Sequence, residues 1–227
     1  LLQSATLQDS GAKQVSRANT RLLVYDISKD RVPAQPVASY VLQLPVYTQA
    51  GDGSAPDRTA AQSELLALND RQFLVLSRDG SGLGQERRNP VFKSVLLVDI
   101  GEATNLAGTP YDTGTTPVAP GGVLRDDIIP VRTTEFVNIL NRAQLAKFGE
   151  SLDNTHPTRF TIGEKWEGMA LASALDPAFP DDYFLFIGND NDFLSRACRV
   201  GGEDCSQDVD SDTTLLVYRV TLPGAQR

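Results

Sequence analysis

The stretch that decides the fold is KWEGMALASALDPAFPDDYFLFIGNDNDF, residues 165–193. It reads as a short strand, a turn rich in proline and aspartate, and a second strand. The apolar run of the second strand, residues 183–187, is too short for a helix and rich in strand-forming side chains. It ends in four oxygen-bearing side chains, Asn189, Asp190, Asn191 and Asp192. The stretch therefore predicts two strands that deliver polar groups to one place.

The same three-strand phrase recurs along the chain. Its pieces are LLQSATLQDSG (1–11) with RLLVYDI (21–27) and ASYVL (38–42), SELLALNDRQFLVLSRDG (63–80) with SVLLVDI (94–100), and residues 166–190 with TLLVYRV (214–220). Repeated units of three or four short strands joined by turns are typical of propeller blades. We therefore predict an all-β protein with the architecture of a β-propeller. A barrel or sandwich of eight strands also explains short strands, but it does not explain the recurrence.

The repeats also predict how much of a propeller is present. The first unit lacks its opening strand, so residues 1–227 begin inside a blade. About three blades cannot close a ring, which takes at least roughly four. We expect residues 1–227 to be the C-terminal part of one propeller domain with six or seven blades. The N-terminal half would be missing or carried on another chain, and would be the first partner.

Two insertions, residues 47–61 and 134–148, interrupt the units. Residues 47–61 read as a mobile loop, and residues 103–130 as a loop with one edge strand. The apolar spacing over residues 134–148 predicts an inserted amphipathic helix, capped by Thr133 or Thr134 and ended by Gly149.

The charge balance excludes one class of partner. The chain has 227 residues and a formal net charge of -8, whereas nucleic-acid binding needs a basic surface. Acidity fits either cation binding or solubility alone. No apolar run approaches the roughly 18 residues of a membrane helix.

Cys198 and Cys205, the only cysteines, predict a disulfide in an oxidising compartment, with two free thiols as the alternative.

Glutamates and strand-end polar residues are the candidates for chemistry. Glu64 and Glu167 are predicted to occupy equivalent positions in two units, each opening an inner strand, so in a propeller they would face the central axis. They could form a metal or acid–base ring, or they could tie neighbouring blades together through backbone amides or an arginine. Arg78 and Lys165 could hold a phosphate. Beside them, Asp79, Asn189, Asp190 and Asp192 offer the oxygen ligands that calcium prefers.

Several other polar features have simpler interpretations. The alternative interpretation of the Asn/Asp run is a set of local turns, since these side chains favour turns for local reasons. We expect the alternating Asp208, Asp210 and Asp212 to form a solvated acidic hairpin. We expect His156 to be a surface residue and residues 80–84 to be a flexible turn.

The ordered set of motifs resembles the phytase-like family, also described as esterase-like activity of phytase. The motifs are SELLALNDRQFLVLSRDG, KSVLLVDIGEAT (93–104), KWEGMA and FIGNDNDF. The resemblance implies a secreted or periplasmic propeller that hydrolyses phosphate or other esters with the help of a metal ion. Matched motif by motif, it implies an axial cluster of Glu64, Arg78, Asp79, Lys165, Glu167, Asn189 and Asp190.

These observations combine into one expected site. We expect catalytic roles for Glu64, Glu167, Arg78 and Lys165, and metal ligation by Glu64, Glu167, Asp79, Asn189, Asp190 and Asp192. Calcium is the expected cation, because a dinuclear transition-metal site would need histidines from the missing half. The expected substrate is a small phosphoester. The alternatives are a non-catalytic propeller that binds a ligand or protein around a structural cation, and a calcium-dependent lactonase-like hydrolase.

Overall fold

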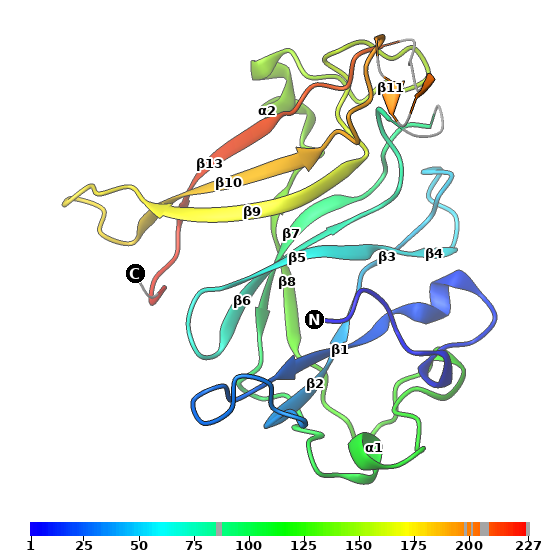
Figure 1. Ribbon diagram of the computed structural model, residues 1–227, viewed down its shortest axis with the longest axis vertical. Helices are drawn as coiled ribbons and strands as arrows, with labels where there is room; N and C mark the ends of the chain where they lie inside the picture. Colours follow the sequence, from blue (N-terminus) through cyan, green and yellow to red (C-terminus); the bar gives the residue numbers. More distant parts are fainter. Residues whose placement is uncertain (85–87, 198, 201, 205–208, 226–227) are drawn as a thin grey trace.

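The computed structural model describes residues 1–84, 88–197, 199–200, 202–204 and 209–225. Its strands form three main antiparallel sheets, which follow one another along the long axis of the molecule (Figure 1). The first has the order β1–β2, the second β5–β6–β7–β8 and the third β13–β10–β9. The all-β prediction is therefore confirmed, although the described sheets do not close into a ring.

The elements of the three sheets begin and end as follows: β1 Asn19–Val24, β2 Ala38–Gln43, β5 Ala61–Ala67, β6 Gln72–Arg78, β7 Lys93–Asp99, β8 Arg132–Asn138, β9 Lys165–Ser173, β10 Asp182–Asp190 and β13 Leu215–Thr221. Two short hairpins add β3 Val46–Tyr47 with β4 Arg58–Thr59, and β11 Arg199–Val200 with β12 Glu203–Asp204. The helices are short: α1 Pro110–Thr113, α2 Arg142–Leu145 and the 3₁₀ turns η1 Leu7–Asp9, η2 Gln14–Arg17, η3 Pro120–Gly122 and η4 Ala146–Phe148.

The middle sheet is buried on both faces. Side chains alternate across a strand, so Leu74 and Leu76 of β6 point to one side and Val75 points to the other. The first side packs on the β9–β10–β13 sheet through a core that includes Trp166, Leu185 and Ile187. The second side packs towards β2 through Leu42, Leu44, Leu96, Val98 and Val131. Near-continuous apolar runs are the expected signature of such doubly covered strands.

The predicted helix over residues 134–148 is wrong in its first half. Residues 132–138 form β8, which pairs with β7 from Asp99 opposite Arg132 to Ser94 opposite Asn138. Helix begins only after Asn141, whose side chain accepts hydrogen bonds from the amides of the first turn. It ends at Gly149, as predicted, with a left-handed φ of 75°. Pairing with an apolar neighbouring strand outweighs the helical spacing in this segment.

The two loop predictions also change. Residues 103–130 contain α1 and η3 but no strand. This segment is held to the N-terminal residues by the buried carboxylate of Asp9. That carboxylate accepts hydrogen bonds from the amides of Val118 and Ala119 and pairs with Arg21 at 2.8 Å. Residues 47–61 contain the last residue of β3, all of β4 and the first residue of β5, rather than loop alone.

A β-bulge sets the correspondence between the second and third sheets. The pairing of β5 with β6 skips Ser63, and the pairing of β9 with β10 skips Glu167. Ser63 therefore corresponds to Glu167, and the predicted equivalence of Glu64 with Glu167 is wrong by one residue. By the same register, Arg78 corresponds to Asp190.

The core between the sheets supplies a stability test. Leu185 is fully buried, so Leu185→Ala should lower the unfolding free energy by about 2–5 kcal/mol through lost burial and an unfilled cavity. Leu7 is 92% exposed, and Leu7→Ala should change the unfolding free energy by less than about 0.5 kcal/mol. Urea unfolding of both variants measures the difference. Equal effects would contradict the described packing.

Candidate functional site

Arg78 joins the second and third sheets. It is the last residue of β6, and its guanidinium reaches across to the carboxylates of Glu167 and Glu164. Its Nε also donates to the hydroxyl of Ser63 at 3.1 Å. Only 11% of the Arg78 side chain is exposed, so these contacts largely replace water around the cation. The structure thus supports the interpretation of Glu167 as a tie between neighbouring units.

Glu164 reaches Arg78 because two backbones cross closely in front of β9. Gly82 has a φ of 138°, and a Cβ built there would lie 2.7 Å from the carbonyl oxygen of Gly163. The crossing is fixed by Leu83, which donates to the carbonyl of Ile162 and accepts from the amide of Glu164. Residues 80–84, predicted as a flexible turn, are instead a tightly packed crossing that only glycine permits.

A fully buried ion pair lies beneath Arg78. The ammonium of Lys93 is 2.9 Å from a carboxylate oxygen of Asp79, and neither side chain is exposed. Lys93 also donates to the main-chain carbonyl of Glu164 at 2.8 Å. The Asp79 carboxylate accepts three further hydrogen bonds, from the amides of Ser81, Val91 and Phe92. Together Arg78, Asp79, Lys93, Glu164 and Glu167 form what we call the Arg78 cluster.

Burial shifts the protonation of two members of this cluster. Desolvation lowers the pKa of Lys93 from its ordinary value, against the opposing attraction of Asp79. Desolvation also raises the pKa of Glu164, although Arg78, Lys165 and Lys93 all act in the opposite direction. Glu164 therefore carries its proton to higher pH than an ordinary glutamate does.

The remaining predicted residues lie at the adjoining ends of β9 and β10. Lys165 pairs with Asp192 at 2.8 Å, and Asp190 lies opposite Lys165 in the register of the two strands. Asp190 accepts a hydrogen bond from the amide of Asp192. The side chain of Asn189 bridges β10 to the segment before β13, accepting from the amide of Thr214 and donating to a carbonyl. These contacts agree with the interpretation of the run as local turns.

Glu64 is the predicted residue that the structure leaves apart. Its carboxylate accepts a hydrogen bond from the amide of Leu65, and among the described residues it forms no hydrogen bond or ion pair with Arg78. Conversely, the sequence reasoning missed Lys93 and Glu164. Lys93 is a charged residue at the head of a buried apolar strand, and that position could have marked it as paired.

The predicted ligands do not make a metal centre by themselves. Within the described ranges, no three His, Cys, Asp or Glu side chains come together in a way that could hold a metal ion. Asp79 is saturated by four donors, and Glu167 and Asp192 are engaged with Arg78 and Lys165. A cation held here would have to displace these partners or draw ligands from elsewhere.

The other candidates resolve as follows. Cys198, Cys205 and Asp208 lie outside the described residues, so the predicted disulfide stays a prediction. Asp210 accepts from the amide of Arg196, and Asp212 pairs with Arg159 at 2.7 Å. His156 is exposed and lies 3.3 Å from Asp153.

The buried pair predicts an asymmetry between two lysines. Lys93→Met should lower the unfolding free energy by about 3–5 kcal/mol, because it leaves the buried carboxylate of Asp79 without its counter-charge. Lys165→Met removes a partly exposed pair and should cost at most about 1 kcal/mol. Urea denaturation measures both. A Lys93 variant no less stable than the Lys165 variant would contradict the described burial.

Glu164 predicts a pH dependence of stability. Its folded pKa lies above the ordinary 4.5, so between these two values the folded state binds more protons than the unfolded state. The unfolding free energy contributed by this group therefore falls as pH rises through that window. Glu164→Gln should remove this fall, and the exposed Glu102→Gln should not. Parallel slopes for wild type and Glu164→Gln in urea titrations from pH 4 upward would refute the assignment.

Comparison with known proteins gives the chain its family. A model of the phytase-like family, described as esterase-like activity of phytase, matches residues 1–193. The chain is also 30% identical over 207 residues to an uncharacterized secreted protein of Arthroderma benhamiae. That match covers 86% of this chain and 40% of the relative, so the chain spans well under half of the relative's length. No solved structure matches the chain. Because the family model covers most of the sequence, the chain belongs to the phytase-like family.

Proposed function

We propose that residues 1–227 form part of a β-propeller that hydrolyses phosphoesters or related esters. The succession of three antiparallel sheets, two of which share a bulge, supports consecutive blades, and the phytase-like family supports a hydrolase. The remaining blades would come from an N-terminal half of the same propeller. The observation that carries the proposal is the meeting of Arg78 with Glu164 and Glu167 beside Lys165, between two blades.

The cluster offers the groups that phosphoester hydrolysis needs. Arg78 and Lys165 are the cations that would bind phosphate oxygens, with the planar guanidinium able to contact two of them. Glu164, with its raised pKa, would carry a proton to or from the reacting oxygen, and Glu167 would orient Arg78. Lys93 and Asp79 would act from beneath by fixing the main chain of Glu164.

Glu64 and the predicted cation need separate treatment. A divalent cation, calcium first, stays a prediction, and ligands from beyond the described residues would have to complete its site. When bound, it would supply Lewis-acid polarisation of a phosphoryl oxygen. Glu64 could serve only such a completed site, because nothing in the described residues links it to Arg78.

One observation favours a second candidate function. Within the Arg78 cluster each cation is paired with a carboxylate, so its charges are already satisfied without a ligand. This is what a non-catalytic binding propeller would require of a tie between blades. The two functions differ in whether Arg78 affects turnover or stability alone.

The proposed location is outside the cell or in the periplasm. The matched relative carries the description of a secreted protein. Among the described residues, no helix is long and apolar enough to cross a membrane.

Hydrolysis of 4-nitrophenyl phosphate tests the leading function. Arg78→Met should lower kcat/KM by about 100-fold or more, because a charged contact to the phosphoryl group is lost, and Arg78→Lys should recover part of it. Arg71→Met is the control, since Arg71 forms a more exposed ion pair with Asp99 at the opposite end of β6, away from the Arg78 cluster.

Thermal unfolding of each variant separates loss of contact from loss of fold. Wild-type turnover in a folded Arg78→Met variant would overturn the catalytic role. No hydrolysis of any phosphoester or lactone by the wild-type protein would favour the binding function.

A further inference from the structure

The outer edge of β13 is open, whereas the corresponding edge of the middle sheet is covered. The shared bulge aligns β9 with β5 and β10 with β6, so β13 corresponds to β7. β7 carries β8 as a fourth strand, but no described strand pairs with the outer side of β13. The third sheet is therefore one strand short of its neighbour.

Hydrogen bonding identifies which backbone groups are open. The amide of Asn189 donates to the carbonyl of Thr214, and the amide of Leu222 donates to the carbonyl of Asp181. In an antiparallel pair the bonded residues alternate, so the even-numbered residues of β13 face β10. The amides and carbonyls of Leu215, Val217, Arg219 and Thr221 consequently point outward, and none has a backbone partner among the described residues.

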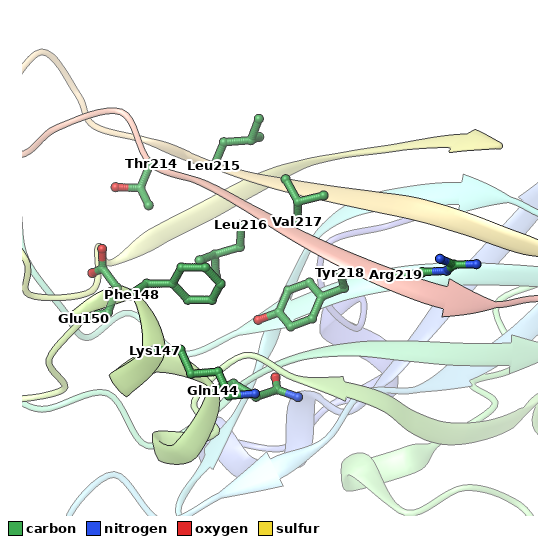
Figure 2. A pocket seen from close by; sticks show the side chains of 10 residues that line it. All are labelled: Gln144, Lys147, Phe148, Glu150, Thr214, Leu215, Leu216, Val217, Tyr218 and Arg219. Atoms are coloured by element: carbon green, nitrogen blue, oxygen red, sulfur yellow. The ribbon is translucent and has the colours of Figure 1, made fainter. Parts of the chain in front are cut away.

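A groove runs along this open edge. Its volume is about 500 Å³, and β13 lines one side of it while α2 and η4 line the other (Figure 2). Its apolar walls include Leu215, Val217 and Phe148, which are 59%, 44% and 65% exposed. Among the described residues, no hydrogen bond or ion pair is found for the polar side chains that line it, which are those of Gln144, Lys147, Glu150 and Tyr218; Tyr218 also packs against the core. Burial raises the pKa of both Glu150 and Tyr218.

We propose that an extended strand from the same polypeptide, outside residues 1–227, adds to β13 as the fourth strand of this sheet. The inference rests on the proposed propeller architecture. The backbone amides and carbonyls of the added strand would pair with those of Leu215, Val217 and Arg219. Every second side chain of the added strand would be apolar and would contact Phe148, Leu216 and Tyr218. β8, which contributes Phe136 and Val137 to the core, is the internal example of such a strand.

The shape of the groove favours a single strand over a second copy of the protein. α2 and η4 face β13 across the groove (Figure 2), so an occupant has to lie between these helical turns and the strand. A second copy would bring its own α2 and η4 to the same edge. The length of the matched relative, of which this chain covers 40%, leaves ample polypeptide to supply the strand.

Residue-resolved amide exchange in the full-length protein tests whether the edge is covered. The amides of Leu215, Val217 and Arg219 should exchange at least about 100-fold more slowly than free peptide amides, as for amides released only by local opening. The positive control is the amide of Leu97, which corresponds to Val217 and lies on β7 beside β8. Exchange of these three amides at free-peptide rates would overturn the proposal.

A photo-cross-link identifies the occupant. We would place p-benzoylphenylalanine at Phe148 in the groove and, as the matched control, at Phe160, which is also exposed at 53%. Only the Phe148 probe should link, within a monomer, to a peptide outside residues 1–227. Links to a second copy, to residues 1–227 only, or equally from both probes would overturn the proposal. Neither readout depends on hydrolysis, so failure of the proposed enzymatic function leaves this test intact.

Discussion

The buried pair of Lys93 with Asp79 is the interaction on which the site depends. A buried charge is tolerated only when it is paired and hydrogen-bonded, and both Lys93 and Asp79 meet that condition. Asp79 binds the amides leading into β7, while Lys93 binds the main-chain carbonyl of Glu164. One ion pair therefore holds together the end of β6, the start of β7 and the entry to β9.

This anchoring explains why Arg78 meets carboxylates from another sheet. The main chain of Glu164 cannot shift without breaking the bond to Lys93 or the close crossing at Gly82. Its side chain is thereby held beside Arg78, whose other partner, Glu167, sits on a bulge that turns it towards the second sheet. The position of the charged groups is thus set by backbone contacts, which is the kind of support a preorganised site requires.

Strand periodicity made most of the fold predictable from sequence. The runs that became β6, β7, β10 and β13 are short, apolar and bounded by turns, so local pattern and tertiary packing agree. Residues 134–148 failed because their apolar spacing suits a helix, whereas the first part completes a sheet by pairing with β7. Local spacing cannot reveal a partner strand that lies a loop of more than thirty residues away.

The site was less predictable than the fold, for two physical reasons. Aligning Glu64 with Glu167 assumed regular pairing, and the bulges that skip Ser63 and Glu167 leave no signal in composition. Glu164 precedes its strand, so only the close crossing with residues 82–83 gives it a role.

The ion pairs of Arg78 limit the chemistry that the proposed site could perform. Since Arg78 already pairs with two carboxylates, the phosphate of the proposed function would have to compete with them, and its binding would free a carboxylate that could accept a proton.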